Sequence, residues 1–296
     1  MIVSTGFFDG VHMGHRAVVS RLVSIARERG DESMVVTFSP HPRTVLQDGA
    51  RDLRLLMSPD EKRDMLRSLG VDRVETVRFT KEFSRLRAED YLREYVIGRF
   101  GGTCILVGYD NRMGSDRLAP PEICSAAERL GLEAIVLGPA ACDGGVAVSS
   151  TKIREALAAG DVEAAASMLG YRYGLLGVTV AGNRLGRTIG FPTANLRLYD
   201  PLKMIPGNGV YAVTVDTLGT VHKGMCNIGV RPTVSSGGTV CVETNIFDFD
   251  EDIYGLDIRL TFVRKIREEQ AFPSLEALRL QLEKDREQCL SILNAG

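Results

Sequence analysis

The first half of the chain alternates short apolar runs with segments of helical periodicity. The apolar run 2–8 precedes a helical pattern over 14–29, whose apolar residues recur every three or four positions up to Gly30. Ser58-Pro59-Asp60-Glu61 is a capping box with proline at the first helical position, so a second helix is expected from there to residue 69. Further strands are predicted at 33–38, 73–79, 104–108 and 132–138, and further helices at 88–100 and 121–130. This alternation predicts an α/β domain: a Rossmann-like parallel sheet covered by helices on both faces.

From residue 173 the pattern changes to closely spaced β-type runs. Strands are predicted at 175–180, 209–217, 220–228, 239–249 and 258–264, and 182–208 is predicted to be a long loop. Short turns between several of these runs predict a small antiparallel β-barrel. A final amphipathic helix is expected over 274–293, and its apolar stripe is predicted to be Leu275, Leu278, Leu282, Leu290 and Leu293.

Two short helices, at 151–159 and 161–169, are assigned to the end of the first domain. The predicted domains are therefore 1–171, with the parallel sheet, and 172–296, with the barrel and the terminal helix. In sheets of the first kind, ligands bind at the carboxyl ends of the strands, near the point where the strand order reverses.

Composition restricts the classes of function. The chain has 296 residues, 44% of them hydrophobic and 25% charged, with a formal net charge of −2, so it has no basic excess of the kind that nucleic-acid binding needs. Its six cysteines form no C-x-x-C pair, which favours reduced thiols in a cytoplasmic protein. No signal peptide is recognisable, and no apolar run approaches the ~18 residues of a membrane span. We expect small-molecule substrates, no nucleic acid, no membrane, and a monomer or weak homo-oligomer.

The segment 6–15 (GFFDGVHMGH), between the first strand and the first helix, is the first candidate site. Its glycines allow close approach to a ligand, and the helix N-terminus offers free N–H groups to a phosphate. His12 and His15 bracket Gly14 and can stabilise charge that develops on a phosphate. A structural zinc site is the weaker alternative, because H-x-x-H lacks two further ligands.

A second phosphate-binding segment is Ser149-Ser150-Thr151-Lys152-Ile153-Arg154. Its hydroxyls and free N–H groups open a helix, and Arg154 one turn later can clamp a phosphate with two hydrogen bonds. Taken alone, Ser150 or Thr151 is equally well an N-cap, and Arg154 a solvated surface residue.

These segments together resemble the nucleotidyltransferase half of prokaryotic bifunctional riboflavin kinase/FMN adenylyltransferases, the FAD synthetases. The segment 6–15 is similar to the family's G-x-F-D-G-x-H-x-G-H, and 38–43, 108–114 and 149–154 are similar to its later segments. Asn111 and Met113 depart from the family, which usually has aromatic residues there; Met113 could still pack on a flavin ring. The resemblance implies that the catalytic residues are His12, His15 and Arg154. It implies that Gly6, Phe7, Phe8, Asp9, Gly10, Gly14, Asp110, Ser150 and Thr151 bind the nucleotide or the flavin.

The loop 182–195 (GNRLGRTIGFPTAN) is the third candidate site. Glycine-rich turns can direct N–H groups at phosphates, but this loop lacks the Gly-Lys-Ser/Thr of a Walker A motif. On glycine content alone it could be a flexible connection. Glu243 lies on a predicted barrel strand, where the default role of a glutamate is to face solvent.

The loop 182–195 is similar to G-x-x-L-G-R-x-x-G-F-P-T-A-N, the riboflavin kinase signature, at every specified position. The resemblance implies that Glu243 is the catalytic base, that Thr193 and Asn195 hold Mg²⁺, and that the nucleotide is bound by Gly182, Arg187, Gly190, Phe191, Pro192, Thr193 and Asn195. With ATP as co-substrate, riboflavin would become FMN, and FMN would then become FAD. Three alternatives stay open: only one live activity, a silent flavin or nucleotide sensor, and a nucleotidyltransferase with another phosphate acceptor.

Overall fold

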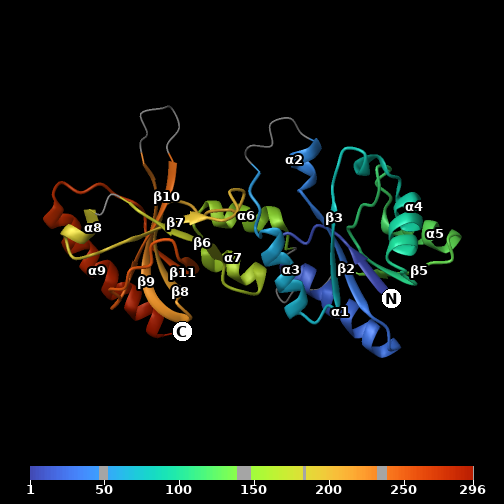
Figure 1. Ribbon diagram of the computed structural model, residues 1–296, viewed down its shortest axis with the longest axis horizontal. Coiled ribbons are helices and arrows are strands. Elements are labelled where there is room, and N and C mark those ends of the chain that lie inside the picture. Colours follow the sequence, from blue (N-terminus) through green and yellow to red (C-terminus); the bar gives the residue numbers. More distant parts are fainter. Residues whose placement is uncertain (47–52, 139–147, 183–184, 232–238, 296) are drawn as a thin grey trace. The chain divides into compact units, whose positions relative to one another are not determined.

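The computed structural model describes residues 1–46, 53–138, 148–182, 185–231 and 239–295. The chain folds into two compact units, Met1–Ser150 and Thr151–Gly296. Figure 1 shows that the first unit contains an open sheet and the second a barrel. Within the described ranges, no helix is both long enough and apolar enough to cross a lipid bilayer.

A parallel sheet in the order β3-β2-β1-β4-β5 organises the first unit. Its strands are β1 (Ile2–Thr5), β2 (Ser33–Ser39), β3 (Arg73–Arg78), β4 (Cys104–Gly108) and β5 (Glu133–Leu137). Its helices are α1 (Met13–Arg29), α2 (Pro42–Leu46), α3 (Pro59–Ser68), η2 (Phe83–Arg85), α4 (Ala88–Tyr91), η3 (Leu92–Arg99) and α5 (Pro120–Arg129). In Figure 1, α1 and α3 lie on one side of the sheet and α4 and α5 on the other. The predicted fold class of this unit is confirmed, and the strand order reverses beside β1, which makes its carboxyl end the expected ligand-binding edge.

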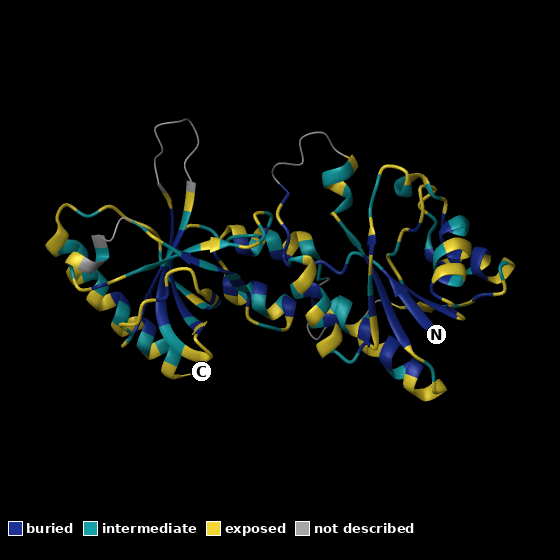
Figure 2. Cartoon of the chain, in the orientation of Figure 1, coloured by how far each residue is buried: buried dark blue, intermediate teal, exposed yellow. Residues whose placement is uncertain are grey.

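Local sequence signals account for several of these elements. Ser58 Oγ accepts the Glu61 N–H at 3.2 Å, and the Glu61 carboxylate accepts the Ser58 N–H at 2.8 Å, so the capping box predicted at the start of α3 is formed. The helix predicted at 88–100 is present, but its second part, η3, is a π-helix. Figure 2 shows the central strands β1, β2 and β4 largely buried, because they are covered on both faces, whereas the edge strands β3 and β5 are mostly intermediate or exposed.

The second unit is a closed barrel in the order β10-β7-β6-β11-β8-β9, with antiparallel pairing. Its strands are β6 (Gly174–Val180), β7 (Ala194–Leu198), β8 (Gly209–Thr217), β9 (Thr220–Arg231), β10 (Thr239–Ile246) and β11 (Asp257–Arg267). The barrel is therefore confirmed, but the prediction of one long loop over 182–208 is wrong. That range contains the short helix α8 (Leu185–Thr188) and the strand β7, which has no β-branched residue and so carries little strand signal.

Two short helices, α6 (Ser150–Ala158) and α7 (Val162–Leu169), connect to the barrel by direct interactions. The Gly207 N–H donates to the Leu157 carbonyl at 2.8 Å, and Arg264 on β11 forms an ion pair with Glu163 at 2.8 Å. They are part of the second compact unit, which begins at Thr151. The predicted functional boundary between 171 and 172 stays a prediction.

The terminal helix α9 (Leu275–Asn294) begins after Ser274, whose hydroxyl accepts the Ala277 N–H at 3.1 Å. Leu282, Leu290 and Leu293 pack against a small barrel core as predicted. The prediction for Leu275 is wrong: its side chain is 54% exposed, because it lies in the first turn of the helix. The side chain that α9 buries most deeply besides Cys289 is charged: Asp285 accepts hydrogen bonds from Arg267 at 2.7 to 3.0 Å.

Candidate active sites

The loop from β1 to α1 brings two histidines into contact. The imidazole rings of His12 and His15 stack with centroids 3.7 Å apart and planes at 17°, and the His15 N–H donates to His12 Nδ1 at 3.4 Å. A Cβ at Gly14 would lie 3.3 Å from the His12 ring, a close approach that would require the ring to shift. His15 Nδ1 is buried and has no hydrogen-bond partner among the residues that the structure describes. A buried polar atom without a partner is the kind of group that a ligand can satisfy.

Burial keeps both histidines neutral. It lowers the pKa of His12 to about 4, against the opposing charges of Asp9 and Asp110. Burial also lowers the pKa of His15 well below 6.5, and electrostatic repulsion from His12, when that ring is protonated, and from Lys62 adds to this effect. At neutral pH the pair therefore offers N–H donors and lone pairs rather than two cations.

The backbone of this loop is strained and held in place from several sides. Phe8, Gly10 and Val11 have φ angles of +48°, +80° and +37°, a left-handed region that costs energy for residues with a side chain. The Asp9 carboxylate accepts the N–H groups of Leu56 at 3.0 Å and Met57 at 3.2 Å, and thereby ties the loop to the segment before α3. Asp9 thus supports the loop backbone, in addition to its charge near His12.

The flanking residues of the first motif also lie at this edge of the sheet. The Gly6 N–H donates to the Val36 carbonyl at 3.0 Å. The Phe7 ring packs against Phe38 and His41, with centroids 5.2 and 5.3 Å away, so an aromatic surface borders the loop. Ser150, at the start of α6, donates through Oγ to the Asp9 carbonyl at 3.0 Å and so adjoins the loop. Thr151 is exposed and Arg154 half-buried within the second unit.

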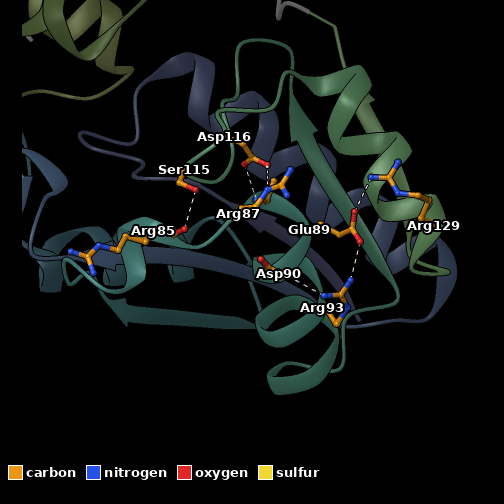
Figure 3. Close-up of polar contacts among 9 residues, drawn as sticks. Arg85, Arg87, Glu89, Asp90, Arg93, Ser115, Asp116 and Arg129 are labelled. Atoms are coloured by element: carbon orange, nitrogen blue, oxygen red, sulfur yellow. Dashed lines mark hydrogen bonds and ion pairs between the residues drawn. The ribbon is translucent and has the colours of Figure 1, made fainter.

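The third segment, 108–114, reaches the same edge in a different way. The Asn111 side chain donates to the carbonyl of Thr5, the last residue of β1, at 3.2 Å, so this departure from the family has a structural role. Asp110 is exposed, close enough to His12 to affect its pKa. Met113 packs instead in the core on the α4 and α5 side and is only 5% exposed, which leaves little of it for a flavin ring. Figure 3 shows how the segment is anchored just beyond Met113: Asp116 accepts the Ala88 N–H at 2.9 Å and pairs with Arg87.

In the barrel, the predicted kinase residues form a row across three strands. Glu243 on β10 lies directly opposite Asn195 on β7 and Asn227 on β9, and directly opposed residues point to the same face of a sheet. The Thr193 hydroxyl donates to the Glu243 carboxylate at 3.5 Å. Gly182 adjoins the row as well, because a Cβ there would lie 2.2 Å from the Asn195 side chain. A hydroxyl, a carboxamide oxygen and a carboxylate are hard oxygen donors that suit Mg²⁺.

A cavity of about 450 Å³ adjoins Thr193, the residue that hydrogen-bonds Glu243. Its lining includes Thr179, Pro192, Thr193, Thr244, Asp252 and Ile253. The Thr179 hydroxyl is buried and has no hydrogen-bond partner among the described residues. The cavity is large enough for a small ligand, and it presents polar groups beside apolar ones.

Other residues of the loop 182–195 do not converge on the row. Phe191 is 8% exposed and packs in the core with Met225, Phe247 and Cys289, so it holds the loop to the barrel. Gly190 has φ +83° with open space beside it. The Asn245 side chain donates to the Pro192 carbonyl at 2.7 Å and fixes the loop there. The Arg187 side chain lies outside the described residues.

Comparisons with known proteins match both halves of the chain. A model of the FAD synthetase family matches residues 1–152, and a model of the riboflavin kinase family matches residues 169–293. Proteins named bifunctional riboflavin kinase/FMN adenylyltransferase from Listeria monocytogenes and Escherichia coli K12 are 35% and 37% identical to this chain. The alignments cover 97% and 96% of this chain and 90% of each relative.

The chain belongs to the bifunctional riboflavin kinase/FMN adenylyltransferase family. The predicted family and enzyme class, a transferase, are thereby confirmed, and so is the order of its two activities along the chain. A crystal structure described as a macrolide-efflux protein from Streptococcus pneumoniae is 32% identical. The match covers 97% of this chain and 92% of that one, with a TM-score of 0.90, so the likeness in fold extends over both units.

Sequence reasoning missed two residues that lie at the candidate sites. Asn245 lies on β10 two residues after Glu243, and its relevance shows only in its hydrogen bond to the Pro192 carbonyl of the loop 182–195. Lys62 on α3 donates to the Phe7 carbonyl at 2.9 Å and is 8% exposed. The sequence does indicate that Lys62 is buried. Lys62 lies one helical turn before the buried Leu66, on the face of α3 that helical periodicity assigns to the core.

Proposed function

We propose that the two reactions of the family occur at the two sites described above, one in each compact unit. Adenylylation of FMN is assigned to the loop from β1 to α1, and phosphorylation of riboflavin to the row formed by Asn195, Glu243 and Asn227. The observation that carries this proposal is that His12 and His15 meet in the first unit, whereas Asn195 and Glu243 meet in the second together with Thr193. Thr151 and Arg154 belong to the second unit, and the resemblance to the family assigns them to the first site. Separate assembly of the two sets supports two independent active sites.

At the first site, the phosphate of FMN attacks the α-phosphorus of ATP and pyrophosphate leaves. The protein has little covalent chemistry to supply, so positioning and charge stabilisation dominate. Neutral His12 and His15 donate hydrogen bonds to the phosphate oxygens, and His15 Nδ1 finds the partner that the protein does not provide. Arg154 supplies the positive charge that two neutral imidazoles lack, and Gly6, Gly10, Ser150 and Thr151 line the phosphates.

At the second site, Glu243 takes the proton of the terminal hydroxyl of the ribityl chain, whose oxygen attacks the γ-phosphorus of ATP. The bond from that phosphorus to the bridging oxygen breaks, and ADP leaves. Thr193 and Asn195, together with phosphate oxygens, would hold Mg²⁺, and the ion would neutralise phosphate charge when bound. Gly182, Pro192 and the adjoining cavity accept the nucleotide, and Arg187 and Gly190 complete the loop around it. Thr193, which hydrogen-bonds Glu243 at 3.5 Å, links the base to the phosphate-binding loop.

The remaining assignments follow from composition and chain organisation. We place the functional boundary between residues 171 and 172. The net charge of −2 supports an enzyme that binds no nucleic acid, and six cysteines without a C-x-x-C pair support a cytoplasmic one. We further propose a monomer or weak homo-oligomer.

The variant His15→Ala tests the assignment of the first site. It should reduce kcat/KM for conversion of FMN to FAD by about 100-fold or more, the usual effect of losing a transition-state donor. Conversion of riboflavin to FMN should stay within about twofold of the wild type, because Glu243 is unaffected. Met13→Ala, which removes an exposed neighbour on the same helical turn, is the matched control. If His15→Ala leaves FAD formation intact, the first site is elsewhere.

A further inference from the structure

Lys62 carries a buried positive charge that the motifs do not account for. Its side chain is 8% exposed, and its Nζ donates to the Phe7 carbonyl at 2.9 Å. Among the described residues no carboxylate lies within ion-pair distance of this ammonium, and burial lowers the pKa of Lys62 to about 8, against the opposing charge of Asp9. Burying an ammonium without a paired anion costs free energy of folding. Its presence beneath a phosphate-binding loop points to a role in binding or catalysis.

The hydrogen bond from Lys62 fixes one peptide group of the first motif. The Phe7 carbonyl also accepts the Thr37 hydroxyl at 3.2 Å, so two side chains from α3 and β2 hold it. Because a trans peptide is planar, its N–H points away from its carbonyl, and the Phe8 N–H is therefore fixed on the opposite edge. The Phe8 amide finds no acceptor among the described residues, and the Phe8 ring lies against His15, with centroids 5.2 Å apart. Left-handed φ angles at Phe8 and Gly10 are typical of backbone turns that collect N–H groups around an anion.

We propose that Lys62 is a positioning residue for FMN adenylylation: it holds the Phe7–Phe8 peptide so that the Phe8 N–H donates to a phosphate oxygen of ATP, and it supplies positive charge behind His15. This inference rests on the assignment of adenylylation to the His12–His15 site. The ligand class is a nucleoside triphosphate, whose negative charge provides the counter-charge that Lys62 lacks in the protein. The phosphorylation site in the barrel should not depend on it.

The test compares Lys62→Met with the wild type, with Lys62→Arg, and with Arg63→Met as the matched control on the exposed side of α3. Methionine has a similar length, so the packing of α3 is kept while the charge and the donor are lost. Lys62→Met should lower kcat for FMN adenylylation about 30-fold or more and should leave riboflavin phosphorylation within about twofold. Its thermal midpoint should equal or exceed that of the wild type, because a buried charge has been removed.

A pH profile gives a second readout that a purely structural role would not change. The neighbouring ionisable groups are Asp9 in the loop and His15 on α1, and burial holds the pKa of His15 well below 6.5, so His15 does not titrate near pH 8. Lys62 must be protonated to act, so kcat/KM for adenylylation should fall as pH rises above about 8 in the wild type. This alkaline limb should be absent in Lys62→Met and should move to higher pH in Lys62→Arg.

Each outcome decides the question. If Lys62→Met keeps adenylylation within about threefold of the wild type, or loses both activities together with its thermal midpoint, Lys62 is not a positioning residue. An unchanged alkaline limb in Lys62→Met would also overturn the proposal. A different result would refute the assignment of adenylylation to the His12–His15 site: His15→Ala would still form FAD, whatever the effect of Lys62→Met.

Discussion

Replacing Glu243 by glutamine should stop riboflavin phosphorylation without disturbing the barrel. Glutamine keeps the shape and one acceptor oxygen but cannot take a proton from the ribityl hydroxyl. Loss of a general base typically costs 10²–10⁴ in rate, so kcat for FMN formation should fall about 1,000-fold, which corresponds to about 4 kcal/mol of transition-state stabilisation. The structural cost is small, because the hydrogen bond from Thr193 is 3.5 Å long and glutamine still faces Asn195 and Asn227.

The assay follows riboflavin, FMN and FAD by chromatography in one reaction with ATP and Mg²⁺. Glu243→Gln should leave riboflavin unconverted but should still make FAD from added FMN at the wild-type rate, and its urea midpoint should not move. Asp216→Asn, which neutralises an exposed carboxylate on β8, should change neither step. A Glu243→Gln enzyme that still forms FMN within about tenfold of the wild-type rate would refute the assignment of the base.

Two further predictions concern stability of the first unit. Gly114→Ala should lower the free energy of unfolding in urea by about 2–4 kcal/mol, because φ is +75° and the new Cβ would lie 2.2 Å from the Ala88 nitrogen. It should reduce FAD formation more than FMN formation. Gly101→Ala, at φ +66° with open space, should cost only about 1 kcal/mol, and equal costs would contradict the steric argument. The free energy of unfolding of the wild type should fall as pH drops from 6.5 towards 4. In this range His12 binds a proton in the unfolded state but stays neutral in the folded state, because burial lowers its pKa to about 4. This difference in pKa corresponds to a loss of up to about 3 kcal/mol of stability. His12→Gln should flatten this dependence in pH-series denaturation, and an unchanged slope would show that other groups cause it.

Elements with strong local signals were predictable from sequence. The strand over 104–108 was predicted from a short apolar run, which is typical of a buried strand. The helix α3 was predicted from its capping box, which is typical of a helix N-terminus. The strand β7 was missed because its five residues, ANLRL, follow a glycine-rich loop and gain their conformation from pairing with β6 and β10. Local sequence does not report such long-range pairing, which can override intrinsic preference.

At the candidate sites, too, the sequence predicts less about those properties of a residue that depend on the tertiary structure. His12, His15, Thr193, Asn195 and Glu243 could be named from motifs, and the structure brings each set together. The way in which a motif residue acts was less predictable. Phe191 and Met113 were read as possible ligand contacts, but their large apolar side chains contribute most by burial in a core, and that depends on the tertiary environment.

The residues of the first motif are therefore not the same set as the residues that shape the first site in this enzyme. Asp9 and Gly14 stand in the first motif, yet one fixes the loop through two backbone N–H groups and the other makes room for the His12 ring. Lys62 stands outside every motif, yet it holds the same strained loop by the carbonyl of Phe7. A loop with left-handed φ angles at Phe8 and Val11 persists only if its surroundings over-determine it. The geometry of the loop that carries the two histidines is thus set by α3 and β2 as much as by the motif itself.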